Sequence, residues 1–396
     1  GVAMKFGREY ILPTPLDPRV LLWEAPAVAE MAMKTGVARK NIDIDEYREQ
    51  LAYRQGKGER IRYFFQNKAR SSGGKKRVAF AEGEEQKIIR AAYQIQEEGI
   101  ATPVLIGRKN VIAEQLKNLS IEYKPEIVDP AVFNKLEAYA KSFYEIRQRK
   151  GVMASDTLKK VQDPNIFGSL MVKMGDADAF ISGLTYDYPD VIRPALQIHR
   201  TAPGVARAAG VYIMIFEEKV FLFTDATVNI DPNAEDLAEI ACLAADYAVK
   251  LEIEPHVAFL SFSNFGSTPH PLSDKVRKAV ALVKARRPDL LVDGEMQADT
   301  AVVPEIVEER YPFSAVKDAN VLVFPSLESA NIAYKLLARL GNAKAIGPIL
   351  LGVGAPVHVL QTGDDVNAIV QIAAVAVMDA MGRAEKGADK KAGKKK

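Results

Sequence analysis

The apolar residues of this chain follow two spacings. Short apolar runs such as RVAF at 77–80 and HVAFLSFS at 256–263 are typical of buried strands. Longer stretches between them repeat apolar residues at helical spacing. Residues 77–107, RVAFAEGEEQKIIRAAYQIQEEGIATPVLIG, read as strand, turn, helix and strand. This alternation predicts an α/β fold with a parallel sheet.

The same pattern continues to the end of the chain. We expect a long helical region at about 130–175, a strand in ADAFISGL and a helix in DYPDVIRPALQIHR, which an Asp and a Pro open. VYIMIFEE and KVFLFTDATVN predict a hairpin, and further α/β units follow. The run NIAYKLLARLGNAKAIGPILLGVGAPVHVL at 331–360 predicts a helix, a Gly-Asn turn and two strands before a last helix.

Ahead of this region, one amphipathic helix is predicted from about Leu21 to Thr35, ended by Gly36. The polar stretch 55–76 contains Ser71, Ser72 and two glycines, and predicts a linker.

Composition narrows the class of protein. With 396 residues we expect two or three domains, and a net charge of +2 gives no general nucleic-acid surface. The Lys-rich segment 383–396 is predicted to be disordered. One cysteine, Cys242, excludes an intrachain disulfide and fits a reducing compartment. No apolar stretch reaches about 20 residues and no signal peptide opens the chain, so we expect a cytoplasmic protein that does not bind a membrane.

From Arg77 onward, long collinear phrases resemble phosphotransacetylases. They include AEGEEQKIIRAA, DVIRPALQIHRTAPGV, FTDATVNIDPNAEDLAEIA, PDLLVDGEMQADTAVVPE and ANVLVFPSLESANIAYKL. The resemblance implies two α/β domains of the isocitrate/isopropylmalate dehydrogenase-like type, residues 77–204 with 346–382 and the inserted residues 205–345. It also implies a cleft between them that binds acetyl-CoA, and a homo-dimer or higher homo-oligomer.

A second resemblance covers the start of the chain. Residues 1–54, with YILP, Asp-Pro-Arg and Gly-Val-Ala, resemble the end of the nucleotide-binding domain of bacterial malic enzymes. SNFGS and PVHVL are similar to the phosphotransacetylase-like domain at the C-terminus of those enzymes. The G-x-G-x-x-G turn that cradles NAD(P) is absent. The resemblance implies that NAD(P) and a divalent metal belong only to a malic enzyme domain outside this sequence.

The reactive residues of the family do not match. Where phosphotransacetylases carry a Leu-Ser-Arg-Gly loop and an Asp on the next helix, this chain has Gln361, Thr362 and Ala368. Asn264 and Phe265 stand where enzymatic members have Thr-Lys. We therefore expect the domain to be catalytically silent. The alternatives are an active phosphate acetyltransferase and, from architecture alone, a decarboxylating dehydrogenase.

Several residues are candidate ligand contacts. From the residues alone, Arg193 and Arg339 are helix-surface arginines, but a guanidinium in a cleft can clasp CoA phosphates. The segment Leu260–Ser267 is a strand that runs into a Gly-Ser turn, and such backbone can present N–H groups to an anion. The resemblance implies that acetyl-CoA, as a regulatory effector, is bound by Arg193, Arg339, Ser263, Asn264, Gly266 and Asn331.

Other polar residues receive structural roles. We expect Asp364 and Asp365 to cap the last helix. The histidines at 199, 256, 270 and 358 are far apart in sequence and predict no metal site. Glu82 follows the first strand, where it could face a ligand or start a helix.

Overall fold

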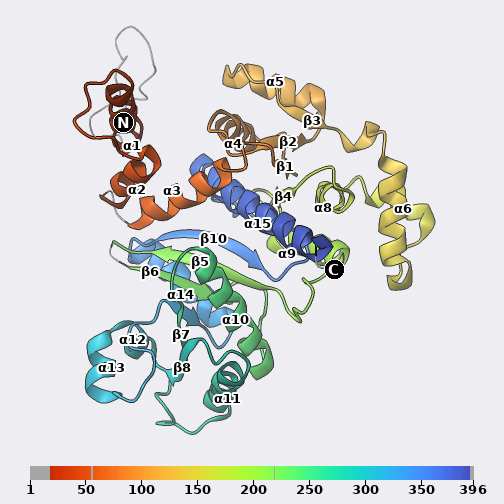
Figure 1. Cartoon of the computed structure of the whole chain (residues 1–396). Coiled ribbons are helices and arrows are strands. Elements are labelled where there is room, and N and C mark those ends of the chain that lie inside the picture. The colour runs from red at the N-terminus through yellow and green to blue at the C-terminus, as the bar shows by residue number, and fades with distance from the viewer. Residues whose placement is uncertain (1–17, 55–56, 218, 393–396) are drawn as a thin grey trace. The chain divides into compact units, whose positions relative to one another are not determined.

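The computed structural model describes residues 18–54, 57–217 and 219–392. The chain divides into two compact units, one of residues 1–64 with 216–219 and one of 65–215 with 220–396 (Figure 1). Residues 1–17, which include the YILP motif, lie outside the described residues.

The smaller unit is helical. Helix α1, Pro18–Lys34, packs against α2, Ile44–Arg54. The predicted helix at 21–35 is thus confirmed, and it ends at Gly36, whose φ of +76° suits a residue without a side chain. Trp23, Val28 and Met31 of α1 are exposed.

The predicted linker at 55–76 is wrong over most of its length, because α3, Lys57–Arg70, occupies it. Ile61, Phe65 and Ala69 are four residues apart and all are buried, which gives this polar segment one apolar helical face. Only the predicted turn remains, at residues 71–74.

The first sheet of the larger unit is parallel and has the order β11-β4-β1-β2-β3. Its strands are β1 (Arg77–Phe80), β2 (Thr102–Ile106), β3 (Glu126–Val128), β4 (Ala179–Ser182) and β11 (Val357–Val359). The connecting helices are α4 (Gln86–Glu97), α5 (Lys109–Leu119), α6 (Leu136–Arg147), α7 (Ala154–Lys160), α8 (Pro164–Met174) and α9 (Tyr188–His199). Short 3-10 turns occur at Pro130–Val132 and Gln148–Lys150.

The second sheet is mixed and has the order β10-β5-β6-β9-β7-β8. The predicted hairpin is confirmed, since β5 (Ala209–Ile215) and β6 (Val220–Thr224) pair antiparallel. The remaining strands are β7 (His256–Leu260), β8 (Leu291–Met296), β9 (Val321–Val323) and β10 (Lys344–Leu351). The helices are α10 (Ala234–Lys250), α11 (Pro271–Arg286), α12 (Ala298–Val302), α13 (Pro304–Arg310) and α14 (Leu327–Leu340). In sequence, β5 to β10 lie between β4 and β11 of the first sheet.

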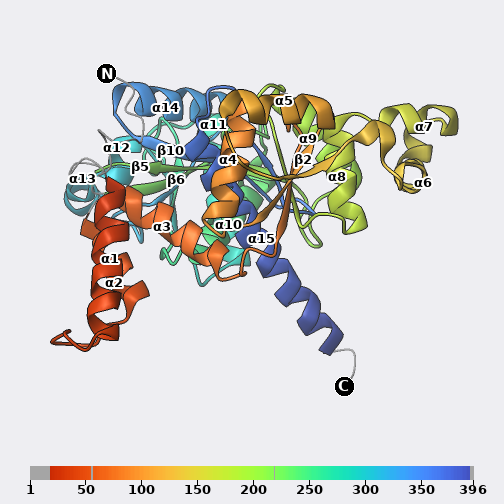
Figure 2. The ribbon, with the colours of Figure 1, turned by 90° about the horizontal axis from the view of Figure 1, so that it is seen from above.

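The last helix, α15 (Val366–Ala392), packs against α4 and the first sheet (Figures 1 and 2). Within the described residues, its window Val366–Arg383 is long and apolar enough to cross a membrane, but 61% of that window is buried inside the protein. Burial of this extent is typical of a helix in the core of a protein.

The predicted disorder at 383–396 is wrong for residues 383–392, which continue α15. Ala, Glu and Lys dominate this stretch and all have high helix propensity, so the charge does not prevent helix formation. Residues 393–396 lie outside the described residues.

Candidate functional site

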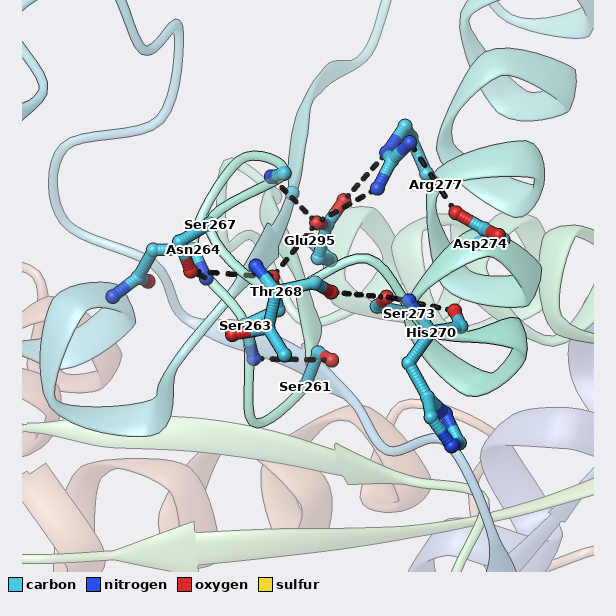
Figure 3. A network of polar contacts seen from close by, with 12 residues as sticks. Ser261, Ser263, Asn264, Ser267, Thr268, His270, Ser273, Asp274, Arg277 and Glu295 are labelled. Atoms are coloured by element: carbon cyan, nitrogen blue, oxygen red, sulfur yellow. Dashed lines mark hydrogen bonds and ion pairs between the residues drawn. The ribbon is translucent and has the colours of Figure 1, made fainter.

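The loop after β7 is built around a buried carboxylate. Glu295, near the end of β8, is fully buried and accepts hydrogen bonds from the Gly266 N–H at 2.7 Å and the Ser263 hydroxyl at 3.2 Å (Figure 3). Arg277 of α11 donates from Nε to the same carboxylate at 3.2 Å. Gly266 has a φ of +88°, a backbone conformation that glycine adopts without strain. One acidic side chain thus fixes a loop from a neighbouring strand.

The electrostatics of Glu295 follow from these contacts. Burial acts to raise the pKa of Glu295, but the guanidinium of Arg277 and the backbone N–H donors outweigh it and hold the pKa below its ordinary value. Glu295 is therefore ionised at neutral pH. This pair could not be predicted from the sequence, because a carboxylate in the strand phrase LVDGEM carries no signal of its partner on a helix.

The backbone N–H groups of this loop are already paired. Phe265 N–H donates to the Glu295 carbonyl at 2.8 Å, Asn264 N–H to Ser267 Oγ at 3.0 Å, and Thr268 N–H to Ser263 Oγ at 3.1 Å. The Asn264 amide also bonds Gln297 at 3.1 Å. The expectation that this backbone presents free N–H groups to an anion is therefore not met, because Glu295 and the serines take them.

A second loop follows β11 and contains the substituted positions. The Gln361 amide donates from Nε2 to the carbonyl oxygen of Gly347 on β10, at 3.1 Å. The Gln361 N–H donates to Asp364 Oδ2 at 2.8 Å. Thr362 is exposed, and Ala368 lies in the first turn of α15. Gln361 is thus held by two hydrogen bonds from its own atoms.

The two aspartates of this loop have different roles. Asp365 caps α15 as predicted, accepting from the Ala368 N–H at 2.8 Å. Asp364 is largely buried and accepts from Gln361 rather than from α15. The pKa of Asp364 is raised to about 6, because burial and the charge of Asp365 raise it by more than the Gln361 N–H and the Lys87 ammonium lower it. Lys87 Nζ donates to the Asp364 carbonyl at 2.8 Å.

Tyrosines gather beside this loop. Tyr212 of β5 stacks on Tyr334 of α14 with ring centroids 4.0 Å apart, and their hydroxyls are 3.3 Å apart. Burial raises the pKa of Tyr212, and Tyr334, Tyr188 and Asp364 raise it further. Gly347, which accepts from the Gln361 amide, lies against the Tyr212 ring, so the loop after β11 adjoins the stacked pair. A tyrosine within an apolar strand gave no signal of this arrangement.

The structure places the other candidate residues as follows. Asn331 lies one turn before Tyr334 on α14 and is half-buried. Arg193 on α9 and Arg339 near the end of α14 are exposed, and among the described residues neither makes a hydrogen bond or ion pair. Within the described part of the chain, neither arginine is bonded to the 261–268 loop. Their assignment to acetyl-CoA stays a prediction.

The remaining polar residues have partners within the fold. His199 and His256 bond backbone carbonyls at 2.9 and 3.0 Å, and the described residues contain no group of three possible metal ligands. Glu82 neither starts a helix nor faces open space. It is buried and accepts from the N–H groups of Gly183 and Thr185, which ties β1 to the loop after β4.

The arrangement of two sheets around these loops has known counterparts. A family model described as Phosphate acetyl/butaryl transferase matches residues 62–377. The chain belongs to this family. It superposes on a phosphotransacetylase from Streptococcus pyogenes with a TM-score of 0.77 at 37% identity, over 81% of this chain and 98% of that one. For EutD phosphotransacetylase from Staphylococcus aureus the TM-score is 0.74 at 32% identity, over 81% and 99%.

Two kinds of curated relatives match. The phosphate acetyltransferase of Clostridium acetobutylicum is 43% identical over 315 residues, which are 77% of this chain and 95% of that relative. The NADP-dependent malic enzyme of Escherichia coli is 38% identical over 386 residues, which are 95% of this chain. The chain spans about half the length of that malic enzyme, since the match covers 50% of it.

Proposed function

We propose that this chain is an acetyl-CoA-binding regulatory region of a malic enzyme and that it does not itself transfer acetyl groups. The observation that carries the proposal is the pair of hydrogen bonds that Gln361 makes within the fold. Its amide is bound to the Gly347 carbonyl and its N–H to the Asp364 carboxylate. The position where related enzymes carry a reactive serine is therefore occupied by a side chain with a structural role.

The chemistry explains why turnover is not expected. Attack of a CoA thiol on acetyl phosphate needs a group that takes the thiol proton and donors that stabilise the developing negative charge. Thr362 supplies no guanidinium and Ala368 supplies no carboxylate. The Gln361 amide is not a base, and its N–H donor is in use.

The malic enzyme part of the proposal rests on the extent of the match. Similarity to malic enzymes covers 95% of the chain, whereas similarity to phosphate acetyltransferases covers 77% of it. The family model starts only at residue 62. We therefore assign NAD(P) and a divalent metal to the other half of such a malic enzyme and give them no role in this chain.

For the ligand, we propose a cleft between two α/β domains of the dehydrogenase-like arrangement, residues 77–204 with 346–382 and residues 205–345. Arg193 and Arg339 support this proposal, because each is exposed and neither makes a hydrogen bond or ion pair among the described residues, which leaves the guanidinium available for a CoA phosphate. Asn331 lies on the α14 face that carries Tyr334. Of the loop residues, Asn264 and Gly266 would contact the ligand directly, whereas Ser263 is fully buried and would act by holding the loop through Glu295.

We also propose a homo-dimer. Ile332, Leu336 and Leu340 are exposed and four residues apart, so they form an apolar stripe on α14. Such a stripe can be buried against the same stripe of a second copy in an isologous interface. Light scattering that gives a monomer at micromolar concentration would contradict this proposal.

A second candidate function is an active phosphate acetyltransferase. The 43% identity to the Clostridium acetobutylicum enzyme, higher than the 38% to the malic enzyme, favours it. Thioester formation assays separate the two functions.

Isothermal titration calorimetry tests the proposed ligand. Acetyl-CoA should bind the purified chain, and free acetate at the same concentration should not, because the phosphates and the pantetheine carry most contacts. No heat of binding with acetyl-CoA, in a sample whose fold circular dichroism verifies, would overturn the regulatory proposal.

A further inference from the structure

The loop after β11 places a carboxylate beside Gln361, the position at which the proposed site lacks a reactive serine. Asp364 Oδ2 is fixed by the Gln361 N–H at 2.8 Å, so the charge cannot rotate freely into solvent. Gln361 also donates to the carbonyl of Gly347, and Gly347 lies against the ring of Tyr212, so this loop adjoins the stacked tyrosines of the second sheet. The carboxylate therefore lies beside Gln361 where the loop meets the second sheet.

The charged groups around Asp364 do not neutralise it. Lys87 of α4 donates to the Asp364 backbone carbonyl rather than to its carboxylate. Asp365, on the same loop, adds a second negative charge and caps α15. Tyr212 of β5 is neutral because burial raises its pKa. The charged neighbours of Asp364 thus comprise one cation, Lys87 on the backbone oxygen, and one carboxylate, that of Asp365.

We propose that Asp364 is a specificity-determining residue that keeps phosphate-type dianions, including acyl phosphates, away from Gln361 while admitting the uncharged acyl end of a thioester. The inference rests on the proposed function, since it concerns the acyl end of the same site. It adds a selection rule: the site accepts acyl-CoA and rejects the other substrate class of the family. Coulomb repulsion at a separation of about 5 Å and an effective dielectric of about 40 to 80 corresponds to roughly a fourfold to twentyfold weakening per unit charge.

The ionisation of Asp364 makes this selection dependent on pH. Its pKa of about 6 means that the carboxyl is ionised at neutral pH and largely protonated near pH 5. Tyr212 stays neutral throughout this range, because burial raises its pKa. Acidification should therefore remove one negative charge from this loop, at Asp364.

Equilibrium dialysis with radioactive sulfate tests the proposal, because sulfate is a tetrahedral dianion that does not titrate between about pH 5 and pH 8. The samples are the full chain, Asp364→Asn and Asp365→Asn at constant ionic strength. Asp365→Asn is the matched control, since it removes the same charge and Asn can still cap a helix. At about pH 8 we expect Asp364→Asn to bind sulfate about tenfold more tightly than the full chain, and Asp365→Asn less than twofold more tightly.

Acidification gives a comparison that needs no variant. The unmodified chain should gain about tenfold in sulfate affinity between about pH 8 and pH 5, and Asp364→Asn should gain less than threefold. Equal affinity of the chain and Asp364→Asn at the higher pH would overturn the proposal, as would no measurable sulfate binding by Asp364→Asn. Acetyl-CoA calorimetry on the same samples is a separate readout. If acetyl-CoA does not bind, the proposed function is contradicted. The sulfate measurements still decide whether Asp364 excludes dianions.

Discussion

The side chain of Gln361 donates a hydrogen bond to the Gly347 carbonyl at 3.1 Å, which joins the loop after β11 to strand β10 of the second sheet. Gly347 is buried, so its carbonyl depends on this donor or on another from the protein. The residue that replaces a reactive serine therefore stabilises the fold.

This relationship predicts the effect of Gln361→Ala. The change leaves a buried carbonyl without this donor and should lower the free energy of unfolding by about 1–3 kcal/mol. Thr362→Ala is the matched control, because Thr362 is exposed and should change stability by less than about 0.5 kcal/mol. Urea denaturation measures both variants. Equal midpoints for Gln361→Ala and the control would show that the hydrogen bond contributes nothing.

The raised pKa of Asp364 predicts a contribution to the free energy of unfolding that falls as the pH rises. Its pKa is raised from 3.8 to about 6, so the folded state binds more protons than the unfolded state between these values. Asp364→Asn should therefore stabilise the protein near pH 7.5 by about 1–2 kcal/mol, less than the full linkage value because the side chain is partly exposed. The gain should vanish below about pH 4, where both states are protonated. If Asp364→Asn still stabilises the protein at low pH, the ionisation of Asp364 is not the cause of the gain.

The lowered pKa of Glu295 predicts a contribution to the free energy of unfolding that rises with pH. Its pKa lies below the ordinary 4.5, so its stabilising effect is present above that value and is lost as the pH falls through the lowered pKa. Glu295→Gln should cost about 1–2 kcal/mol near pH 7, less than for a fully buried pair, because half of the Arg277 side chain is exposed. Urea midpoints at several pH values should converge for the two proteins in acid. A difference that is independent of pH would contradict the assigned ionisation.

The two exposed arginines, Arg193 and Arg339, are expected to contribute to the affinity for acetyl-CoA. Arg193→Ala and Arg339→Ala should each weaken acetyl-CoA binding by about 1.5–3 kcal/mol, the range of a hydrogen bond to a charged group. Lys117→Ala on α5 removes an equal charge elsewhere and serves as the control. If Lys117→Ala weakens binding as much as the arginine variants do, the effect is general electrostatics and the proposed contacts are wrong.

The elements of this fold could largely be predicted from the sequence, because strand and helix periods differ clearly in an α/β chain. The hairpin at β5 and β6 and the cap by Asp365 are examples. The helix α3 could not be predicted, because charged residues mask its buried apolar positions.

The site was harder to predict than the fold. The substitutions at Gln361, Thr362 and Ala368 are visible in the sequence, but their consequences depend on contacts between distant segments. Gln361 bonds a residue of another sheet, and Glu295 bonds an arginine on a helix. No local pattern encodes such pairs, since only the tertiary fold brings them within hydrogen-bonding distance.

The most direct test measures turnover and binding on one preparation of the purified chain. Thioester formation from acetyl phosphate and CoA is followed beside an authentic phosphotransacetylase, and acetyl-CoA binding is titrated by calorimetry. Loss of one oxyanion-type donor typically lowers a rate by about 10²–10³, and here three groups of the reactive set are replaced. The account predicts clear binding of acetyl-CoA with a rate at least about a thousandfold below the control enzyme. A rate within about tenfold of that enzyme would contradict it and establish the chain as an active acetyltransferase.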